Sequence, residues 1–246
     1  MKSNQIQSRI LHLNQLDNTQ TLSPDEYQAK MKVLKNRIRE LTFLSKSKDR
    51  PILLVFEGWD AAGKGGAIRR LTQEIDPRLF EVHNISAPSS EEIQHHYLWR
   101  FWNRIPKKGQ IGIFDRSHYG RVLVERVEGF ASESEWSRAY EEILLFEEQL
   151  LAFGTIIIKF WLHIDKEEQL VRFESRKNDP LKRWKLSDED WRNRDKWALY
   201  EEAANQMFQK TNAPKAPWVL VPANDKYFAR KTVLESVVER LEEELE

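Results

Sequence analysis

The stretch that decides the fold reads PILLVFEGWDAAGKGG, from Pro51 to Gly66. Its first half is a short apolar run ended by glycine, as expected of a strand buried on both faces. Its second half fits G-x-x-x-x-G-K, in which backbone N–H groups wrap a phosphate and the lysine neutralises it. A helix that starts directly after such a loop points its N-terminus at the anion. The stretch therefore predicts a phosphate-binding loop, and the alternative is a glycine-rich turn with a solvent-facing lysine.

Each position of this loop has an expected task. Gly58 and Gly63 permit the tight turn, and the amine of Lys64 meets the phosphate oxygens. The full set of residues expected to surround the phosphate is Gly58, Ala61, Ala62, Gly63, Lys64, Gly65 and Gly66.

One departure from the usual loop concerns the metal. Gly65 replaces the Ser or Thr that normally follows the lysine and holds Mg²⁺. Asp60 lies inside the same loop, and a carboxylate that faces phosphates without a cation between them would be repelled. We therefore expect Asp60 to be a metal ligand, and the alternative is a turn residue whose side chain bonds to the nearby backbone.

A second carboxylate and two arginines follow the apolar run IGIFD at 111–115. Asp115 ends this run, where a parallel sheet presents residues to its ligand crevice. It is the expected Walker B aspartate and second metal ligand, unless it only caps a following helix. Arg116 and Arg121 suit fork-like binding of phosphate oxygens, with plain surface charges as the alternative.

Further apolar runs typical of strands occur at 82–88, 155–165 and 218–224. Longer amphipathic stretches separate them, and the one at 132–153 opens with a capping box. Strands that alternate with helices indicate a parallel sheet covered on both faces. The expected fold class is α/β, a P-loop kinase fold with a helical lid. Residues 51–246 are expected to form this domain, which ends in a helix at 230–246 that packs on the sheet.

Residues 1–50 are expected to form a helical arm that packs on this core. The first 22 residues indicate only a loose arm or a marginal helix. Ser23, Pro24 and Glu26 then form a helix start signal. A stripe of apolar residues follows at steps of four and three: Tyr27, Met31, Leu34, Ile38 and Leu41. This stripe either packs on its own domain or forms a symmetric contact in a homo-oligomer, which we slightly favour.

The segment 172–196 is rich in basic residues and is the expected lid. Asn178-Asp179-Pro180 breaks its first helix, and Ser187 with Asp190 caps a second one. A helix, a basic turn and a second helix can close over phosphates, with a solvated helical surface as the alternative. The side chains expected to bind phosphate here are Arg172, Arg176, Lys182, Arg183 and Lys185.

Two tryptophans are placed where they could touch a ligand. Trp59 lies inside the phosphate loop and Trp184 lies in the basic turn of the lid. Together with Arg116 they are the expected nucleotide-binding residues. The six histidines show no metal-ligand spacing, and we assign no catalytic role to His118, which lies near the proposed site.

Composition limits the possible partners. Lys plus Arg and Asp plus Glu both total 39, so the formal net charge is zero. A polyanion must then be bound by local clusters of basic residues, and broad nucleic-acid binding is not expected. The absence of cysteine excludes disulfides and thiolate metal sites. We expect a cytoplasmic protein without a membrane partner, because the sequence shows neither a signal peptide nor the ~18-residue apolar run that spans a bilayer.

Three stretches, EGWDAAGKGGAI, IGIFDRSHYGRVLVERVEGF and RFESRKNDPLKRWKLSDEDW, resemble the family-2 polyphosphate kinases over about 51–224. YGRVLVERVEGF and HHYLWRFW are most similar to the polyphosphate:AMP phosphotransferase branch, here with one such domain. The resemblance implies a thymidylate-kinase-like P-loop fold, polyphosphate as phosphate donor, and Mg²⁺, or Mn²⁺ in its place, bridging the phosphates. It also implies that the catalytic positions are those of Asp60, Lys64, Asp115 and Arg116.

The sequence thus predicts a Mg²⁺-dependent kinase that transfers phosphate from inorganic polyphosphate to AMP, with ADP as a further acceptor. An ATP-dependent nucleoside monophosphate kinase remains an alternative, because it shares the loop, the aspartate and the lid. A second alternative is a non-catalytic P-loop module that binds a nucleotide. The paired aspartates argue against this module, since a pure polyanion binder gains nothing from carboxylates beside its phosphate loop.

Overall fold

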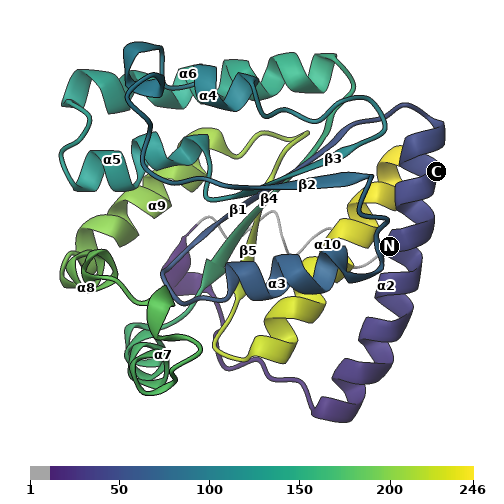
Figure 1. Cartoon of the computed structure of the whole chain (residues 1–246), viewed down its shortest axis with the longest axis horizontal. Coiled ribbons are helices and arrows are strands. Elements are labelled where there is room, and N and C mark those ends of the chain that lie inside the picture. The colour runs from purple at the N-terminus through teal and green to yellow at the C-terminus, as the bar shows by residue number, and fades with distance from the viewer. Residues whose placement is uncertain (1–11) are drawn as a thin grey trace.

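Residues 12–246 are described by the computed structural model, and they form a five-stranded sheet with helices on both faces (Figure 1). The strands are β1 (Ile52–Gly58), β2 (Phe80–Asn84), β3 (Ile111–Asp115), β4 (Ile156–His163) and β5 (Trp218–Pro222). Their order is β2-β3-β1-β4-β5, and every neighbouring pair is parallel. The α/β fold class predicted from the sequence is confirmed.

Strand β1 lies at the point where the chain changes direction across the sheet. β2 and β3 lie on one side of β1 in the sheet, and β4 and β5, which follow later in the chain, lie on the other. Ligands of such sheets bind outside the carboxyl ends of the strands at this point. Phe56 of β1 is in register with Asp115 of β3. The phosphate loop and Asp115 therefore leave the sheet side by side at its carboxyl edge.

Two groups of helices cover the two faces of the sheet (Figure 1). On one face lie α3 (Lys64–Leu71) and α10 (Lys226–Leu245), and α2 (Pro24–Ser47) packs on the outside of α10. The other face carries α4 (Trp99–Trp102), α5 (Val124–Val127), α6 (Glu133–Ala152) and α9 (Trp197–Thr211). Beyond the carboxyl edge stand α7 (Lys166–Asn178) and α8 (Asp188–Asp195). The described residues also form 3-10 turns at Leu13–Gln15, Thr72–Glu74, Glu92–Gln94, His118–Val122 and Arg183–Lys185.

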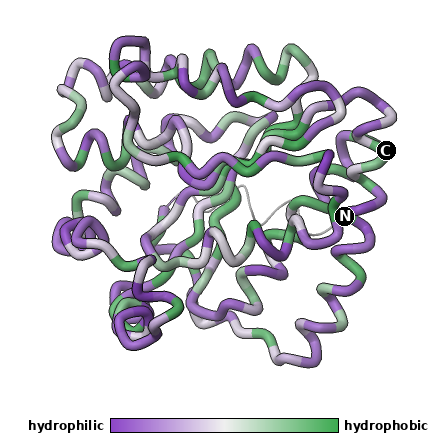
Figure 2. Tube along the Cα trace, in the orientation of Figure 1, coloured by the Kyte–Doolittle hydropathy of each residue, from purple (hydrophilic) through white to green (hydrophobic). Residues whose placement is uncertain are grey.

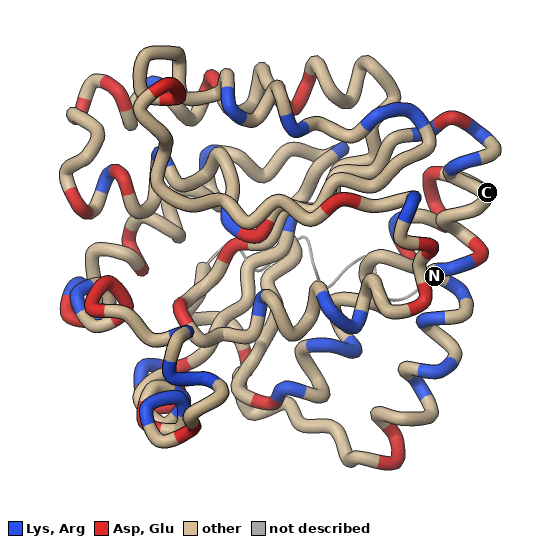
Figure 3. Tube along the Cα trace, viewed as in Figure 1, with Lys and Arg blue, Asp and Glu red and all other residues tan. Residues whose placement is uncertain are grey.

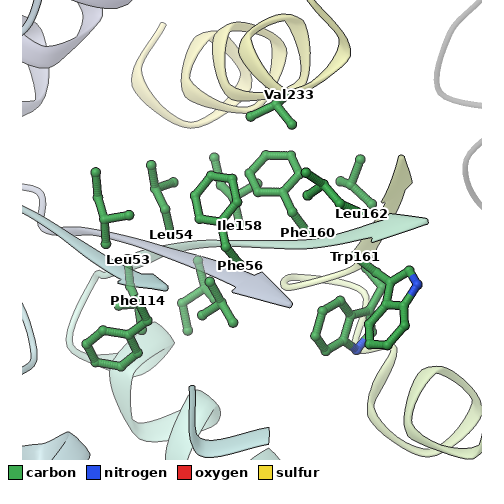
Figure 4. Packing of buried hydrophobic residues seen from close by; sticks show 14 of the residues in the cluster. Leu53, Leu54, Phe56, Phe114, Ile158, Phe160, Trp161, Leu162 and Val233 are labelled. Carbon is green, nitrogen blue, oxygen red and sulfur yellow. The ribbon is translucent and has the colours of Figure 1, made fainter. Parts of the chain in front are cut away.

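Alternate side chains of the central strands enter two apolar layers (Figure 4). Phe56 and Phe160 stack with ring centroids 5.0 Å apart, on the face where Val233 of α10 lies. Trp161 points to the opposite face and meets Phe208 of α9 edge-on. Because both faces are covered, β1 and β4 are buried along almost their whole length. This explains why they are continuous apolar runs in the sequence.

The hydropathy of the chain follows the same layers. Figure 2 shows hydrophobic residues gathered in the central strands and hydrophilic residues on the outer turns of the helices. Amphipathic helices that wrap a sheet produce this distribution. Among the described residues, no helix is both long and apolar enough to cross a membrane.

Helix α2 packs its apolar stripe on its own chain. It begins as the sequence predicts, with Ser23 and Glu26 in a reciprocal capping box. Met31, Ile38 and Leu41 are buried, and the helix contacts α10. Of the two outcomes left open for the stripe, the structure shows packing on the same domain. The first eleven residues of the predicted arm lie outside the described residues.

Two elements differ most from their predicted bounds. β2 covers residues 80–84 instead of 82–88, and it is a largely exposed edge strand, not one buried on both faces. An edge strand carries few apolar residues, so the sequence marks its limits weakly. α10 starts at Lys226 and not at Arg230, because the Asp225 carboxylate caps the helix by accepting from the Phe228 N–H.

Gly58 is required by a close contact with the neighbouring strand. Its φ is +139°, and a Cβ added there would lie 2.4 Å from the carbonyl oxygen of Leu162. Gly129 is a matched control: its φ is also positive, +73°, but no described atom lies within 4 Å of its added Cβ. We expect Gly129→Ala to cost about 1 kcal/mol and Gly58→Ala at least ~2 kcal/mol more. Urea denaturation of both variants measures the difference, and equal costs would contradict the steric argument.

Candidate active site

The loop from Gly58 to Gly63 has a backbone that most residues avoid. Gly63 has a φ of +110°, and Ala61, which is not a glycine, has a φ of +62°. An L-residue in this region costs roughly 1–2 kcal/mol, so other contacts must hold the loop. α3 begins directly at Lys64, and its first N–H groups have no partner inside the helix. The end of the loop therefore presents free donors and a partial positive charge.

Two side chains of α7 hold the carbonyl groups of this loop. Gln169 Nε2 donates to the carbonyl of Asp60 at 3.1 Å. Arg172 Nη1 donates to the carbonyls of Ala61 and Ala62, both at 3.0 Å. These bonds turn the loop's carbonyl groups toward α7, which supports the strained φ of Ala61.

Arg172 uses all five of its N–H donors on the protein itself. Besides the two loop carbonyls, Nη2 donates to the carbonyls of Ala223 and Asn224 at 2.7 and 2.8 Å, and Nε donates to Glu168 at 2.6 Å. Only 5% of the residue is exposed. The prediction that Arg172 binds phosphate is therefore wrong in this structure: the residue lies beside the phosphate loop but binds its backbone.

Asp60 accepts one hydrogen bond on each carboxylate oxygen. Arg116 Nη2 donates to Oδ1 at 3.0 Å, and Asn193 Nδ2 of α8 donates to Oδ2 at 2.9 Å. Burial of the carboxyl opposes ionisation, but the charges of Lys64 and Arg116 outweigh it and hold the pKa of Asp60 below its usual value. Asp60 is therefore ionised at neutral pH. These hydrogen-bond partners are distant from Asp60 in sequence. A turn residue, the alternative role for Asp60, would instead bond to the nearby backbone.

Lys64 and Arg116 lie on either side of this carboxylate. Lys64 Nζ donates to the carbonyls of Gly58 and Trp59, at 2.7 and 3.1 Å, so its amine lies over the loop. Arg116 has a φ of +64°, and its side chain also lies 3.8 Å from Glu189 of α8. A left-handed conformation outside glycine is often found at functional sites.

Asp115 ends β3 with its carboxylate beside the start of α3. A Cβ added to Gly65 would lie 3.8 Å from Asp115 Oδ2, so the missing side chain leaves space next to this oxygen. Ser117, not Asp115, caps the 3-10 turn that follows. In residues 12–246 no three His, Asp or Glu side chains gather as a ready metal site. Two carboxylates still fit Mg²⁺, which takes oxygen ligands and usually keeps water or phosphate for the remainder.

Two cavities lie on either side of the phosphate loop. Residues 58–60 line the first, which has a volume of about 70 Å³ and which we call the carboxylate cavity. Residues 61–63 line the second, which has a volume of about 220 Å³ and which we call the basic cavity. A group bound at the loop can thus be approached from both sides.

The basic cavity is lined by cations from α7, the segment after it and α10. Figure 3 shows basic residues on α7 and on the turn beside it. Within the described chain its lining has no carboxylate and six cations: Arg172, Arg176, Lys182, Lys185, Lys226 and Arg230. Arg176, Lys182 and Lys185 stand where the lid prediction expects them. Lys226 and Arg230 were missed, although i,i+4 basic residues on a helix after the last strand are a detectable signal.

The carboxylate cavity combines acidic and apolar groups. Its lining includes the carboxylates of Glu57, Asp60 and Glu189, together with Arg116. Tryptophan and aliphatic side chains complete one wall. This mixture suits a ligand with both a charged part and an apolar ring.

Trp59 reaches the carboxylate cavity but is held mainly by the protein. Its ring stacks on Trp197 with centroids 3.7 Å apart, and its indole N–H donates to His163 Nδ1 at 2.9 Å. Only 5% of the residue is exposed. One face of the indole is therefore covered, and at most its edge or other face can meet a ligand.

Seven predicted site residues lie outside both cavity linings of the described chain: Lys64, Gly65, Gly66, Asp115, Arg121, Arg183 and Trp184. Arg121 pairs with Glu125 at 3.0 Å and stacks over Tyr97. Arg183 Nε donates to the carbonyl of Lys177. Trp184 is 78% exposed. The contacts of Arg121, Arg183 and Trp184 are thus made with residues outside the phosphate loop.

Asn193 and Tyr200 were missed by the sequence interpretation. Asn193 bonds Asp60, and the hydroxyl of Tyr200 donates to Asn193 Oδ1 at 3.0 Å. Both line the carboxylate cavity. They lie more than 130 residues from Asp60 in a polar helical stretch, and no local pattern distinguishes them from exposed residues.

Glu57 is a fully buried carboxyl directly below the loop. Its Oε1 accepts from the Ser117 hydroxyl at 2.7 Å. Burial raises the pKa of Glu57 from 4.5 to about 7, although the Ser117 hydrogen bond and the charges of Lys64 and Arg116 act in the opposite direction. Because the pKa of Glu57 lies near neutral pH, its ionisation is sensitive to any change in charge at the site.

The raised pKa of Glu57 predicts a pH-dependent stability. A carboxyl whose pKa is higher in the folded state retains its proton there, so its contribution to stability falls as pH rises from about 4.5 to about 7. Glu57→Gln removes this loss while keeping an acceptor for Ser117. We expect the variant to gain about 2–3 kcal/mol over the parent protein between pH 5 and pH 8. Denaturation at both pH values checks this, and a pH-independent difference would contradict the raised pKa.

Comparison with known proteins gives consistent relatives. The family model described as polyphosphate kinase 2 matches residues 21–246. A polyphosphate:AMP phosphotransferase of Pseudomonas aeruginosa is 50% identical over 94% of this chain and 46% of its own length. An NDP-polyphosphate phosphotransferase of Ruegeria pomeroyi is 42% identical over 77% of this chain and 62% of its own. The chain therefore spans about half the length of the first of these relatives.

Solved structures agree with this family. A putative polyphosphate kinase 2 from Pseudomonas aeruginosa superposes with a TM-score of 0.92 at 49% identity, over 94% of this chain and 50% of that one. A polyphosphate kinase 2 from Arthrobacter aurescens superposes with a TM-score of 0.91 at 33% identity, over 96% and 89%. The family model over residues 21–246 and these matches show that the chain belongs to the polyphosphate kinase 2 family.

Proposed function

We propose that this protein transfers a phosphoryl group from inorganic polyphosphate to AMP, with ADP as a further acceptor, in a reaction that requires Mg²⁺. The observation that carries the proposal is the pair of unlike cavities that meet at one phosphate loop. In the described chain all the charged residues that line one cavity are cations, and the other cavity combines carboxylates, an arginine and apolar rings. A transferring phosphoryl group at the loop would lie between a polyanion and a nucleotide.

The basic cavity suits polyphosphate as the donor. Polyphosphate has no base or sugar, so recognition can rest on charge alone. The cavity offers the ammonium groups of Lys182, Lys185 and Lys226 and the guanidinium groups of Arg176 and Arg230. A nucleotide donor such as ATP would also need a surface for its adenine, and the lining of this cavity offers no aromatic side chain in the described chain.

The carboxylate cavity suits the nucleotide acceptor, but only after the lid moves. Its volume of about 70 Å³ is far below the ~300 Å³ or more of typical ligand cavities. Glu189 and Asn193 of α8 form part of its wall, and Asn193 bonds Asp60. Opening of α8 would break this bond and enlarge the cavity, as in enzymes whose lids close over phosphates.

Catalysis would rest on positioning and charge. The N-terminus of α3 and Lys64 would hold the phosphates next to the bond that breaks, and Arg116 would neutralise charge on the transferring group. Asp60 and Asp115 would hold Mg²⁺, which supplies further charge neutralisation on the phosphate oxygens when bound. Little proton transfer is required, which agrees with the absence of an assigned histidine.

The relatives' names support the choice of substrates. Polyphosphate appears in the names of all the curated relatives cited above, with AMP in one and NDP in the other. An ATP-dependent nucleoside monophosphate kinase remains the competing enzyme, and a non-catalytic nucleotide module the competing class.

We also propose a cytoplasmic homo-oligomer, in line with the sequence interpretation. Val33 and Phe43 of α2 are 68% and 52% exposed and leave apolar surface on this helix after its stripe is buried. Light scattering at high concentration tests the assembly, and a monomer alone would refute it.

A donor exchange tests the proposed function. The protein is incubated with Mg²⁺ and AMP, and either long-chain polyphosphate or ATP is added as the donor. We expect ADP to form with polyphosphate at a rate at least about tenfold above that with ATP, because the basic cavity has no adenine surface. Chromatography of the nucleotides measures both rates. Faster transfer from ATP would favour the competing kinase, and no transfer from either donor would favour the non-catalytic module.

Asp60→Asn tests the metal role of the loop carboxylate. Asparagine keeps the size of the side chain and one acceptor for Arg116 but removes the charge. We expect a loss on the order of 10²-fold or more in rate, with part of it restored at high Mg²⁺ or with Mn²⁺. Gly65→Ser in the same background should restore some activity, because a Cβ there has ordinary contact with Asp115.

The matched control for this variant is Asn193→Ala, which removes the other partner of Asp60 and leaves its charge in place. We expect the control to change substrate affinity through the lid but not the Mg²⁺ concentration for half-maximal rate. If Asp60→Asn folds normally and keeps the parent's Mg²⁺ dependence, the carboxylate is an anchor for Arg116 and the lid, not a metal ligand.

A further inference from the structure

A second basic groove lies outside the site, between α2, the end of α3 and α10. Its volume is about 630 Å³. α2 and α3 both pack on α10, so the groove runs where the three helices meet (Figure 1). We call it the outer groove, and its polar and charged lining residues include Lys32, Lys35, Arg69, Arg70, Gln73 and Arg230.

The charge of the outer groove is one-sided. Five of its lining residues are Lys or Arg, and in the described chain Glu74 is its single carboxylate. Within residues 12–246 none of these five cations forms an ion pair. The chain as a whole has no net charge. Unpaired cations gathered in one groove of a neutral protein create a local positive potential that attracts an anion.

The outer groove adjoins the basic cavity at Arg230. This residue lines both, and a Cβ added to Gly66 of the phosphate loop would lie 3.6 Å from Arg230 Nη2. Arg69 and Arg70 extend the path along α3. Because a helix rises 1.5 Å per residue, Arg70 lies roughly 9 Å beyond Lys64 along the helix axis. Cations therefore follow one another from the phosphate loop to α2.

We infer that the outer groove binds the distal part of a long polyphosphate chain while its reacting end lies in the basic cavity. The inference rests on the proposed polyphosphate donor. A linear polyanion longer than the basic cavity must leave it, and the outer groove shares Arg230 with that cavity. A nucleotide base is a poor occupant, because the rings of Tyr27 and Tyr227 in the lining stack on each other at 4.5 Å.

This arrangement makes affinity depend on the length of the polyphosphate. A short chain such as tripolyphosphate fills only the basic cavity and gains nothing from α2. A long chain adds the contacts of Lys32, Lys35, Arg69 and Arg70. Each exposed contact is weak, and several together give a clear preference that salt reduces.

Charge removal in the groove tests the inference. In the variant Lys32→Gln/Lys35→Gln/Arg69→Gln/Arg70→Gln, we expect the KM for long-chain polyphosphate to rise about tenfold or more and to become less sensitive to salt. The KM of tripolyphosphate as a donor, or its inhibition constant if it only competes with the long chain, should stay within about twofold of the parent's value. Thermal unfolding checks that the variant folds.

A matched control keeps the charge loss on the same helix but outside the groove. Lys30 and Arg39 of α2 are exposed and do not line it. Lys30→Gln/Arg39→Gln should keep the parent's KM for long chains, whereas Lys32→Gln/Lys35→Gln should raise it. Equal effects of the two double variants would overturn the inference, since the charges would then act only through the overall field.

Three outcomes separate this inference from the proposed function. If the parent protein uses long polyphosphate and the quadruple variant keeps the same KM, the outer groove is refuted and the proposed function stands. The groove is also refuted if long-chain polyphosphate and tripolyphosphate weaken equally. If the parent uses no polyphosphate of any length, the proposed function fails and the inference fails with it.

Discussion

The site depends on a single buried guanidinium. Arg172 joins α7, the phosphate loop and the end of β5 through five hydrogen bonds. A buried cation is costly unless every donor is satisfied, and here four carbonyls and one carboxylate satisfy them all. The same bonds hold the loop carbonyls away from the anion side and allow Ala61 its positive φ. Loss of this one side chain would release the contacts that join the loop, α7 and the segment after β5.

Helix starts that depend on residues close together in the chain could be predicted from the sequence. The capping boxes at Ser23, Ser132 and Ser187 fix the starts of three helices, and each depends on residues three positions apart. The buried strands are marked by apolar content alone. β2 was misplaced because an edge strand with one partner needs little apolar surface. Local chemistry determines where elements begin, and exposure in the sheet determines how clearly the sequence shows them.

The site was predictable where its residues lie in the phosphate loop, at the end of a strand or in the basic segment 172–196. Asp60, Lys64, Asp115 and Arg116 meet these conditions, and the structure brings them together at the carboxyl edge of the sheet. Arg172 matched the charge of a phosphate ligand, yet tertiary contacts use its donors elsewhere. Composition identifies a cation but cannot tell whether its partner is a ligand or a backbone carbonyl.

The neutral net charge conceals a strong separation of charge across the phosphate loop. The basic cavity has six cations on one side, while Glu57, Asp60 and Glu189 line the cavity on the other. A polyanion is attracted to the first and repelled by the second, so it has one favourable direction of entry. An acceptor with fewer charges and an apolar ring meets less repulsion at the carboxylates. In the proposed reaction, the loop would hold the transferring group between the two cavities, where Lys64 and Arg116 would balance its charge.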